Sequence, residues 1–511
     1  MSIQGSFSHK LLLTDTYHGP IVINYDLMTE KLILAGDLSA MTISRMERRG
    51  EIHRIARGIY TTAADRERYV AAKLYEVVGR IFPDAVITDR SAVTGGPVDG
   101  RLYLSSPFAS RSLRLPGISI EARKGAGPVV GDTQLPGGLY LASRARALLD
   151  NLRPTRSRGG RPRATLTPDE LDDWIDRLCR IEGEERLIHY CDQAQSIYQQ
   201  LGASAADIER LSHRVSAAVR TRTVSTGSAA LQARSRGKPF DADRVDRFDV
   251  LAAALRNSPP QHHYRDERDP LRYRYAPFFD AYFSNFVEGT EFAVKEAASI
   301  VFDGLIPAQR TADAHDVTGT YQILKALQDD ARRPVSGDEF IELLHVRHAV
   351  LMGGRPEKNP GSFKTQGNQA GATVFVAPEM VEGTLREGFD RITSLQTPFE
   401  RAVMMMFVVA EVHPFDDGNG RMARVMMNAE LEAGGETRII IPTVYRDDYL
   451  GALRRLSRYD DASPLTKALS YAHDVFSEID FRDLADAERQ LTAVNAFEEG
   501  SDRRLLRLSS F

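Results

Sequence analysis

The chain has 511 residues, too many for a single hydrophobic core, so two to four domains are expected. Its contents of 42% hydrophobic and 27% charged residues are those of a soluble globular protein. The net charge of −4 hides an uneven distribution: residues 101–165 hold twelve Lys/Arg against three acidic residues, so the N-terminal part is locally basic.

The cysteines and apolar runs give no sign of secretion or of a membrane span. Cys179 and Cys191 form neither a disulfide framework nor a metal-ligand spacing, which fits a reducing compartment. The N-terminus lacks the apolar stretch of a signal peptide. The most apolar run, residues 402–412, is too short to cross a bilayer and predicts a buried core helix. We therefore expect a cytoplasmic protein without a membrane partner.

The first 65 residues predict strands, a short helix and a hairpin. Residues 10–36 alternate apolar and polar side chains, which predicts short strands or an arm. Residues 36–50 fit an amphipathic helix with Asp37 or Ser39 as its cap. Residues 51–60 alternate as the strands of a wing do.

A helix followed by a wing resembles the N-terminal winged-helix domain of AbiEi-type antitoxins and related regulators, over roughly residues 35–65. The resemblance implies a winged helix-turn-helix at residues 1–65 that binds DNA. The contacts would come from polar residues of the predicted helix: Ser44, Arg45, Arg48 and Arg49. The alternative is a helix–hairpin module that packs against its neighbours and binds nothing.

Residues 66–222 predict a mixed β region followed by helices. The stretch 65–82 has a helical pattern, and 84–142 is rich in Gly, Pro and β-forming residues. Residues 153–167 form a basic loop that either touches phosphate backbones or stays solvated. Thr167 then opens a helix in capping-box style.

We place the interdomain linker at 223–239, a mainly helical domain at 240–480 and a C-terminal tail at 481–511. The fold is thus expected to be mainly α, preceded by a small mixed α/β region. Within the helical domain, His345 and His348 read as ordinary helix histidines, because no third metal ligand follows them.

Residues 413–424 read His-Pro-Phe-Asp-Asp-Gly-Asn-Gly-Arg-Met-Ala-Arg. The glycines at 418 and 420 permit backbone angles that a Cβ would resist, so this turn can aim several N–H groups at one point. A helical pattern follows at once, and a helix N-terminus with free N–H groups is a ready anion site.

Charged side chains surround that turn. Arg421 and Arg424 are spaced i, i+3 on the following helix, and arginine grips phosphate oxygens with a bidentate fork. Asp417 stands where a carboxylate beside bound phosphates anchors Mg2+. His413 can accept a proton from an attacking hydroxyl near neutral pH. These are the parts for phosphoryl-type transfer from a nucleotide.

This stretch resembles the active-site motif of the Fic family, His-x-Phe-x-Asp/Glu-Gly-Asn-Gly-Arg-x-x-Arg, and meets every position. The resemblance implies a helical Fic domain that transfers AMP from ATP to a Ser, Thr or Tyr hydroxyl of a target protein. His413 would be the general base, Phe415 would anchor the loop, and Asp417 would hold Mg2+ on the phosphates. A surface turn with incidental charges is the alternative.

The resemblance also assigns the nucleotide. The α- and β-phosphates would be held by four consecutive residues: Gly418, Asn419, Gly420 and Arg421. Arg424 would hold the γ-phosphate, and Asn428 would lie near the nucleoside. Tyr449 either lines the adenine pocket or packs in the core.

Two further segments match the family pattern. Ser284-Asn-Phe-Val-Glu288-Gly289 resembles its inhibitory helix, Ser/Thr-x-x-x-Glu-Gly/Asn. Ser284 and Glu288 share one helix face, so the carboxylate can pair with Arg424 and displace the γ-phosphate. Residues 372–378 predict a strand in the place of the family's flap, which pairs with the target backbone. Its docking residues would be Thr373, Val374, Phe375 and Val376; a plain hairpin is the alternative.

The leading hypothesis is a self-inhibited protein adenylyltransferase that uses ATP and Mg2+. One alternative keeps the same site but lets Glu288 position water, so that the protein also removes AMP. The other is a DNA-binding regulator whose Fic domain senses nucleotide. The sequence leaves open whether the chain forms a homo-oligomer.

Overall fold

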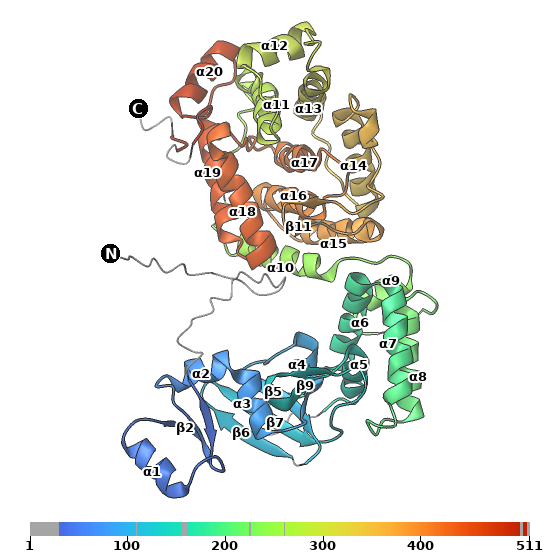
Figure 1. Cartoon of the computed structure of the whole chain (residues 1–511). Helices are drawn as coiled ribbons and strands as arrows, with labels where there is room; N and C mark the ends of the chain where they lie inside the picture. Colours follow the sequence, from blue (N-terminus) through green and yellow to red (C-terminus); the bar gives the residue numbers. More distant parts are fainter. Residues whose placement is uncertain are drawn as a thin grey trace, which may run out of the picture. The chain divides into compact units, whose positions relative to one another are not determined.

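The computed structural model describes residues 30–108, 110–155, 162–223, 226–259, 261–500 and 504–507. The fold is mainly α, with small sheets concentrated in the N-terminal region, as expected (Figure 1). The chain divides into two compact units, Met1–Ser228 and Ala229–Phe511. The boundary falls inside the linker predicted at 223–239, but helix α9 (Ala229–Ser235) occupies part of that stretch.

The described part of residues 1–65 holds the predicted helix and hairpin. The elements are β1 (Leu32–Leu34), α1 (Ala40–Arg48), β2 (His53–Ala56) and β3 (Ile59–Thr61), and the antiparallel sheet has the order β1-β3-β2. The Ser39 side chain accepts the Thr42 N–H and caps α1, which decides between the two predicted caps. Residues 10–29 of the predicted arm lie outside the described residues.

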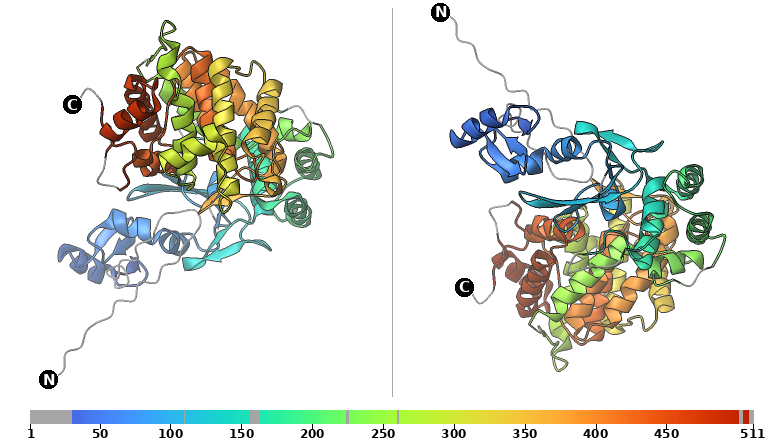
Figure 2. Two further views of the ribbon diagram at one scale, coloured as in Figure 1. Left: turned by 90° about the horizontal axis from the view of Figure 1, so that it is seen from above. Right: turned by 90° about the horizontal axis from the view of Figure 1, so that it is seen from below.

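The winged helix-turn-helix is not confirmed. That motif needs two helices packed together before the wing. Within residues 30–65 the structure has one helix, α1, and the next element after it is the strand β2. In Figure 2, α1 and its sheet form the end of this unit away from α6 to α8.

The remainder of the first unit is built on a mixed six-stranded sheet of order β6-β7-β5-β4-β9-β8. Its strands are β4 (Val86–Ile87), β5 (Arg101–Ser106), β6 (Arg111–Leu115), β7 (Ile118–Lys124), β8 (Thr133–Leu135) and β9 (Leu139–Leu141). Strand β5 lies in the interior of the sheet and is buried on both faces, whereas the edge strand β6 exposes most of its side chains. This arrangement agrees with the β-rich composition of 84–142.

Helices surround this sheet and complete the unit. They are α2 (Arg66–Ala72), α3 (Leu74–Ile81), α4 (Asp89–Thr94), α5 (Arg144–Asn151), α6 (Pro168–Glu182), α7 (Glu184–Ile197) and α8 (Ala205–Ala218). The helix expected at 65–82 is therefore two helices, broken at Lys73. Thr167 and Glu170 form the predicted capping box of α6. Residues 156–161 of the basic loop lie outside the described residues.

The second unit is helical apart from one small hairpin, β10 (Gln369–Ala370) with β11 (Thr373–Val374). After α9 its helices are α10 (Ala242–Arg256), α11 (Ala276–Val287), α12 (Val294–Asp303), α13 (Thr311–Asp329), α14 (Gly337–Leu351), α15 (Val381–Thr393), α16 (Pro398–Val412), α17 (Asn419–Ala433), α18 (Arg446–Tyr459), α19 (Ser463–Glu478) and α20 (Leu484–Ala493).

Helices α16 and α17 form the centre of this unit, and Figure 1 shows them among α11, α13, α14, α15 and α18. Residues 402–409 of α16 are fully buried, which agrees with the predicted core helix. The six residues between α16 and α17 are therefore held between two rigid, buried elements. No helix among the described residues is both long and apolar enough to cross a membrane.

The predicted domain end at residue 480 cuts through a hydrophobic core. Leu491 and Val494, at the end of α20, are fully buried in one cluster with Phe279 and Phe283 of α11. The segment predicted as a tail therefore supports the helix that carries Ser284. Residues 501–503 and 508–511 lie outside the described residues.

Candidate functional site

The loop between α16 and α17 turns sharply at two residues in the left-handed backbone region. His413 ends α16 with φ 53° and ψ 59°, and Gly418 precedes α17 with φ 75°. Two features favour glycine at position 418. Its φ is positive, and a Cβ there would lie 2.8 Å from Met352 Sδ and 2.9 Å from Leu351 Cδ2. A non-glycine residue with positive φ, such as His413, is strained and persists where its surroundings hold it.

Phe415 lies buried beneath the loop between α16 and α17. Its ring is fully buried and stacks on His348 of α14, with centroids 3.6 Å apart and an interplanar angle of 7°. Gly361 N–H donates to His348 Nδ1 (2.9 Å), so Nε2 carries the proton and donates to the Asp417 carbonyl (3.0 Å). Burial lowers the His348 pKa to about 4, so this histidine is neutral. The sequence treated His348 as an ordinary helix residue and missed its role in shaping the loop.

Asn419 closes the loop on itself. Its Oδ1 accepts the Phe415 N–H (2.8 Å), and its Nδ2 donates to the Phe415 carbonyl (2.9 Å). The side chain is 2% exposed. The Asn419 side chain therefore stabilises the conformation of the loop. The backbone N–H groups of the turn are the groups suited to bind an anion.

Arg424 is bound by the end of α11. Its Nε donates to Ser284 Oγ (2.9 Å), and its Nη2 donates to the Ser284 carbonyl (2.7 Å) and to Glu288 Oε1 (2.7 Å). Its guanidinium carbon lies 6.0 Å from the ring centroid of Tyr449, which is 1% exposed. The structure therefore brings together Ser284, Glu288, Arg424 and Tyr449 from three helices.

Glu288 stands directly after α11 as its C-cap, and Gly289 follows with φ 90°. The Glu288 carboxylate lies against the first turn of α17, where a Cβ on Gly420 would overlap Oε1. A helix N-terminus favours negative charge. A carboxylate of the chain itself therefore lies where the sequence predicts bound phosphate.

Arg421 does not face the same way. Its guanidinium pairs with Asp316 of α13, with Nη1 to Oδ2 at 2.6 Å, and the two side chains are 5% and 2% exposed. Arg355 donates to the same carboxylate at 2.8 to 3.0 Å. The Arg421 charge is therefore buried and paired under the loop, and phosphate binding by Arg421 stays a prediction.

Asn428 is held inside the second unit by three hydrogen bonds, and its predicted place near the nucleoside stays a prediction. Its Nδ2 donates to Asp280 (2.8 Å) and to the Ile439 carbonyl (3.0 Å), and its Oδ1 accepts the Ile439 N–H (3.0 Å). The residue is fully buried. Asn428 therefore joins α17 to α11 and to the segment after α17.

The His413 ring lies against the flap hairpin. It stacks on Phe375 with centroids 3.7 Å apart and an interplanar angle of 6°. Its Nδ1 lies 3.3 Å from the Ala410 carbonyl and can only donate there, which leaves Nε2 as the acceptor. Burial lowers the His413 pKa to about 4, so the imidazole is neutral at neutral pH.

The flap strand is shorter than the predicted 372–378. Strand β11 covers Thr373–Val374, and Val376 is 1% exposed, which removes it from the edge. The hairpin has a two-residue loop, and the Phe375 N–H donates to the Asn368 carbonyl across it (3.1 Å). Because hydrogen-bonded and non-hydrogen-bonded pairs alternate in an antiparallel ladder, the Val374 carbonyl points to the outer edge. Arg244 of α10, which also pairs with Glu411, donates to that carbonyl.

A cavity of about 420 Å3 connects these groups. The predicted residues that line it are Glu288, Thr373, Phe375, His413, Gly420, Arg424 and Tyr449. Its opposite wall comes from α18, which the sequence assigned only through Tyr449. The wall residues beyond Tyr449 are Leu450, Leu453, Arg454, Ser457 and Arg458.

The donor set at Asp417 suits Mg2+ that enters with a nucleotide. The carboxylate is 40% exposed, its Oδ1 accepts the Gly418 N–H (2.6 Å), and its Oδ2 lies 3.9 Å from Lys358 Nζ. Mg2+ is typically bound by one or two carboxylates together with phosphates and waters. Across the described ranges, no group of three or more His, Cys, Asp or Glu residues could hold a metal by itself.

The residues predicted to bind DNA lie in the other unit. All four residues are exposed: Ser44, Arg45 and Arg48 on α1, and Arg49 as its C-cap. Arg48 Nε donates to the Ser44 carbonyl (3.3 Å). Exposure alone does not distinguish a DNA contact from a solvated helix face. DNA binding therefore stays a prediction.

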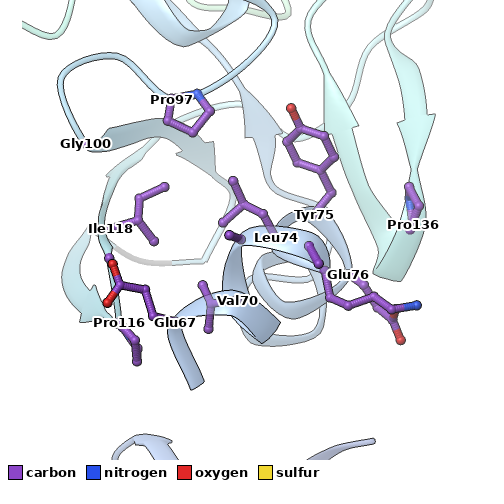
Figure 3. A pocket seen from close by; sticks show the side chains of 14 residues that line it. Glu67, Val70, Leu74, Tyr75, Glu76, Pro97, Gly100, Pro116, Ile118 and Pro136 are labelled. Carbon is purple, nitrogen blue, oxygen red and sulfur yellow. The ribbon is translucent and has the colours of Figure 1, made fainter. Parts of the chain in front are cut away.

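The first unit also contains a cavity of about 650 Å3, shown in Figure 3. Its labelled lining includes Leu74 and Tyr75 of α3 together with prolines at 97, 116 and 136. It contains none of the residues that the sequence marked for chemistry.

Comparisons with known proteins find relatives of this chain, and the matching family model falls within the second unit. The model of the Fic/DOC family matches residues 340–431. Protein adenylyltransferase fic-1 of Caenorhabditis elegans is 27% identical over 223 residues, which cover 39% of this chain and 43% of that protein. The solved structure of Fic-1 (aa134 - 508) from C. elegans is 18% identical, with a TM-score of 0.36, over 64% of this chain and 94% of that one.

A Fido domain-containing protein of Dictyostelium discoideum is 30% identical over 104 residues, which cover 19% of this chain and 73% of that protein. The chain spans less than half the length of the fic-1 proteins of C. briggsae and C. elegans, at 38% and 43%. The matched residues include the whole loop from His413 to Arg424. This chain therefore belongs to the Fic/DOC family.

Proposed function

We propose that this chain is a self-inhibited protein adenylyltransferase, which transfers AMP from ATP to a Ser, Thr or Tyr hydroxyl of a target protein or of the chain itself. The observation that carries the proposal is the Glu288 carboxylate over Gly420, bonded to Arg424. A helix N-terminus and a buried guanidinium together favour an anion there. Relatives named protein adenylyltransferase support the same activity.

The nucleotide would enter when Glu288 leaves. Arg424 would then be free for the γ-phosphate, and the N–H groups at the start of α17 would face the α- and β-phosphates. Tyr449, Leu450 and Leu453 offer an apolar wall for the adenine. Asp417 would hold Mg2+, which supplies positive charge against the phosphates when bound.

His413 would act on the target hydroxyl. Its Nε2 accepts the proton as the hydroxyl oxygen attacks the α-phosphorus. The bond from the α-phosphorus to the oxygen bridging the β-phosphate breaks, and pyrophosphate leaves with that oxygen. The neutral imidazole, stacked on Phe375, is in the required state at neutral pH.

The target segment would pair with β11. An extended peptide gains main-chain hydrogen bonds with little sequence demand when it adds to an exposed strand. The Val374 carbonyl is on that edge and is occupied by Arg244, so a target would replace this hydrogen bond. Phe375, one residue on, stacks on His413, which supports docking of the target beside the proposed base.

The test compares four full-length proteins: wild type, Glu288→Gly, Glu288→Gly with His413→Ala, and Glu291→Gly. Glu291 is exposed on the same segment, so it is a matched control for loss of a carboxylate and gain of a glycine. Each protein is incubated with Mg2+ and ATP labelled on the α-phosphate, and separately on the γ-phosphate. We expect α-label on Glu288→Gly, at least about tenfold above wild type and Glu291→Gly, and none on the double variant.

Label from the γ position alone would show a kinase and contradict the proposal. Equal α-label on wild type and Glu288→Gly would contradict self-inhibition but not AMP transfer. AMP removal is the second candidate, because Glu288 lines the same cavity as His413. It predicts that wild type, but not Glu288→Gly, releases α-label from a chain that has been labelled beforehand.

A further inference from the structure

Two arginines on α18 extend from the predicted nucleotide wall toward the flap. Arg454 and Arg458 are spaced i, i+4, so they share one face of the helix. Both line the cavity that contains His413, and both are exposed. Arg458 Nη2 donates to Thr373 Oγ1 of β11 at 2.8 Å, which places this positive charge directly beside the flap strand.

The charge of these two side chains is not neutralised within the described part of the chain. Their neighbour Arg455 is paired with Asp461 at 2.8 Å, and Arg247 of α10 lies 3.6 Å from Asp460 and 3.5 Å from Glu411. No carboxylate of the described residues lies within ion-pair distance of Arg454 or Arg458. Every other guanidinium just named has an acidic partner, so the mouth of the cavity carries surplus positive charge.

The position of this charge favours the target over the nucleotide. The phosphates are expected at the start of α17, where Arg424 already supplies a guanidinium. Arg458 instead touches Thr373, on the strand whose edge would pair with the target. In an extended segment, side chains at alternate positions point to the same face. Residues two positions before and after the modified hydroxyl therefore lie on the hydroxyl's own side of the strand, facing the cavity.

We propose that the target segment is acidic, with Asp or Glu two positions before or after the modified hydroxyl, and that Arg454 and Arg458 select it. This inference rests on the proposed adenylyl transfer and names the class of substrate for the same site. Arginine binds carboxylates in a bidentate fork, so a flanking Asp or Glu replaces the missing internal partners. Hydrogen bonds from the target's backbone to β11 give affinity for any extended segment. The target's carboxylates, bound by the two arginines, give the preference for acidic segments.

The test uses the full-length Glu288→Gly protein and three short peptides that differ only at the two flanking positions. A central Thr is flanked by Glu, by the neutral isostere Gln or by Lys, and kcat/KM is measured with α-labelled ATP. Each exposed ion pair is expected to change kcat/KM by about two- to fivefold, so two pairs should favour Glu over Gln by about four- to twenty-five-fold. The preference should shrink as the salt concentration rises.

Charge reversal provides the matched comparison. Adding Arg454→Glu and Arg458→Glu should remove the preference for the Glu peptide and favour the Lys peptide. Adding Arg455→Glu places the same charge change on the same helix outside the cavity lining, and it should leave the preference unchanged. Self-labelling of each variant reports that its active site is folded.

The outcomes separate this inference from the function on which it rests. Equal rates for the Glu and Gln peptides would overturn the inference, as would a protein that labels itself but none of the peptides. It would also be overturned if the double reversal raised the KM for ATP equally with every peptide, because the arginines would then serve the nucleotide. Absence of any label on peptides and on the Glu288→Gly chain would instead overturn adenylyl transfer, and the inference with it.

Discussion

Arg421 and Arg424 lie one helical turn apart on α17, yet their guanidiniums meet different partners. Arg424 reaches the cavity and binds Ser284 and Glu288, whereas Arg421 reaches the core and binds Asp316. The spacing of the two arginines was visible in the sequence. Which neighbouring helix covers each face of α17 was not, because Asp316 is far away in the chain.

The buried pair predicts a stability effect at residue 316. Asp316 is the counter-ion of both Arg421 and Arg355, and its side chain is 2% exposed. Asp316→Asn would leave two guanidiniums without that charge, one of them buried. Loss of one partner of a buried pair costs about 3 to 5 kcal/mol. We expect a loss of that size in the unfolding free energy of the second unit, measured by hydrogen exchange of α16 amides.

Asp313 provides the control on the same helix. It also pairs with Arg355, at 3.1 Å, but its side chain is 32% exposed. An exposed pair contributes about 0 to 1 kcal/mol, so Asp313→Asn should cost far less than Asp316→Asn. Equal losses for the two variants would show that burial of the Arg421 pair is not what stabilises the loop.

At the scale of elements, the segment before the flap hairpin holds the motif loop in place. Lys364 Nζ donates to the His413 carbonyl (2.8 Å) and to Asn368 Oδ1 (2.7 Å), and Asn368 Nδ2 donates to the Phe415 carbonyl (3.0 Å). Lys364 is 3% exposed, and burial lowers its pKa to about 8. These bonds fix the carbonyl of a histidine whose backbone is strained.

This contact predicts an effect on turnover. In the Glu288→Gly background, Lys364→Met keeps much of the apolar stem but removes the donor to His413. A small displacement of a catalytic group can cost up to about a hundredfold in rate, so we expect kcat to fall by about ten- to a hundredfold. The KM for ATP should change little, because Lys364 does not line the cavity. Steady-state labelling with α-labelled ATP measures both constants.

Lys325→Met is the control, since the Lys325 side chain on α13 is 42% exposed and pairs only within its own helix. It should leave both constants unchanged. A rise in KM with unchanged kcat for Lys364→Met would contradict a positioning role. Hydrogen exchange of α16 amides in the variants separates loss of positioning from loss of folding of the second unit.

The sequence predicted the elements better than it predicted their partners. The helix cap, placed at Asp37 or Ser39, the capping box at Thr167, the buried α16 and a strand within 372–378 depend on local patterns. The structure contains all of them, with Ser39 as the cap and a strand of two residues. The clamp by Lys364 and Asn368 depends on contacts across 47 to 49 positions. From sequence alone, that segment reads only as a polar loop with glycine and proline.

At the scale of the whole molecule, the two units are separate cores, and the candidate site lies wholly in the second. The second unit also contains the segment predicted as a tail, because α20 packs under α11. A single melting temperature would therefore mix two transitions. Stability arguments about the site need a measurement that reports on the second unit alone, such as hydrogen exchange of α16 amides.

His473 of α19 makes that unit sensitive to acid. The side chain is fully buried, its Nε2 bonds to the Thr437 carbonyl (2.9 Å), and its Nδ1 has no hydrogen-bond partner among the described residues. Burial lowers its pKa from 6.5 to about 3. Below pH 6.5 the unfolded chain therefore binds a proton that the folded chain refuses. The stabilising contribution is complete above pH 6.5 and is lost as the pH falls toward 3.

We expect His473 alone to remove about 2 kcal/mol of unfolding free energy between pH 7 and pH 5. His473→Gln cannot take up this proton, so its stability should fall less steeply over that range, whatever its stability at pH 7. His315→Gln replaces an exposed histidine of the same unit. Its unfolding free energy should fall between pH 7 and pH 5 as much as that of wild type. Exchange of α16 amides at both pH values gives the free energies. If the unfolding free energy of His473→Gln fell with pH as steeply as that of wild type, His473 would not be the acid-sensitive group. Burial of the neutral ring would then not limit the stability of this unit.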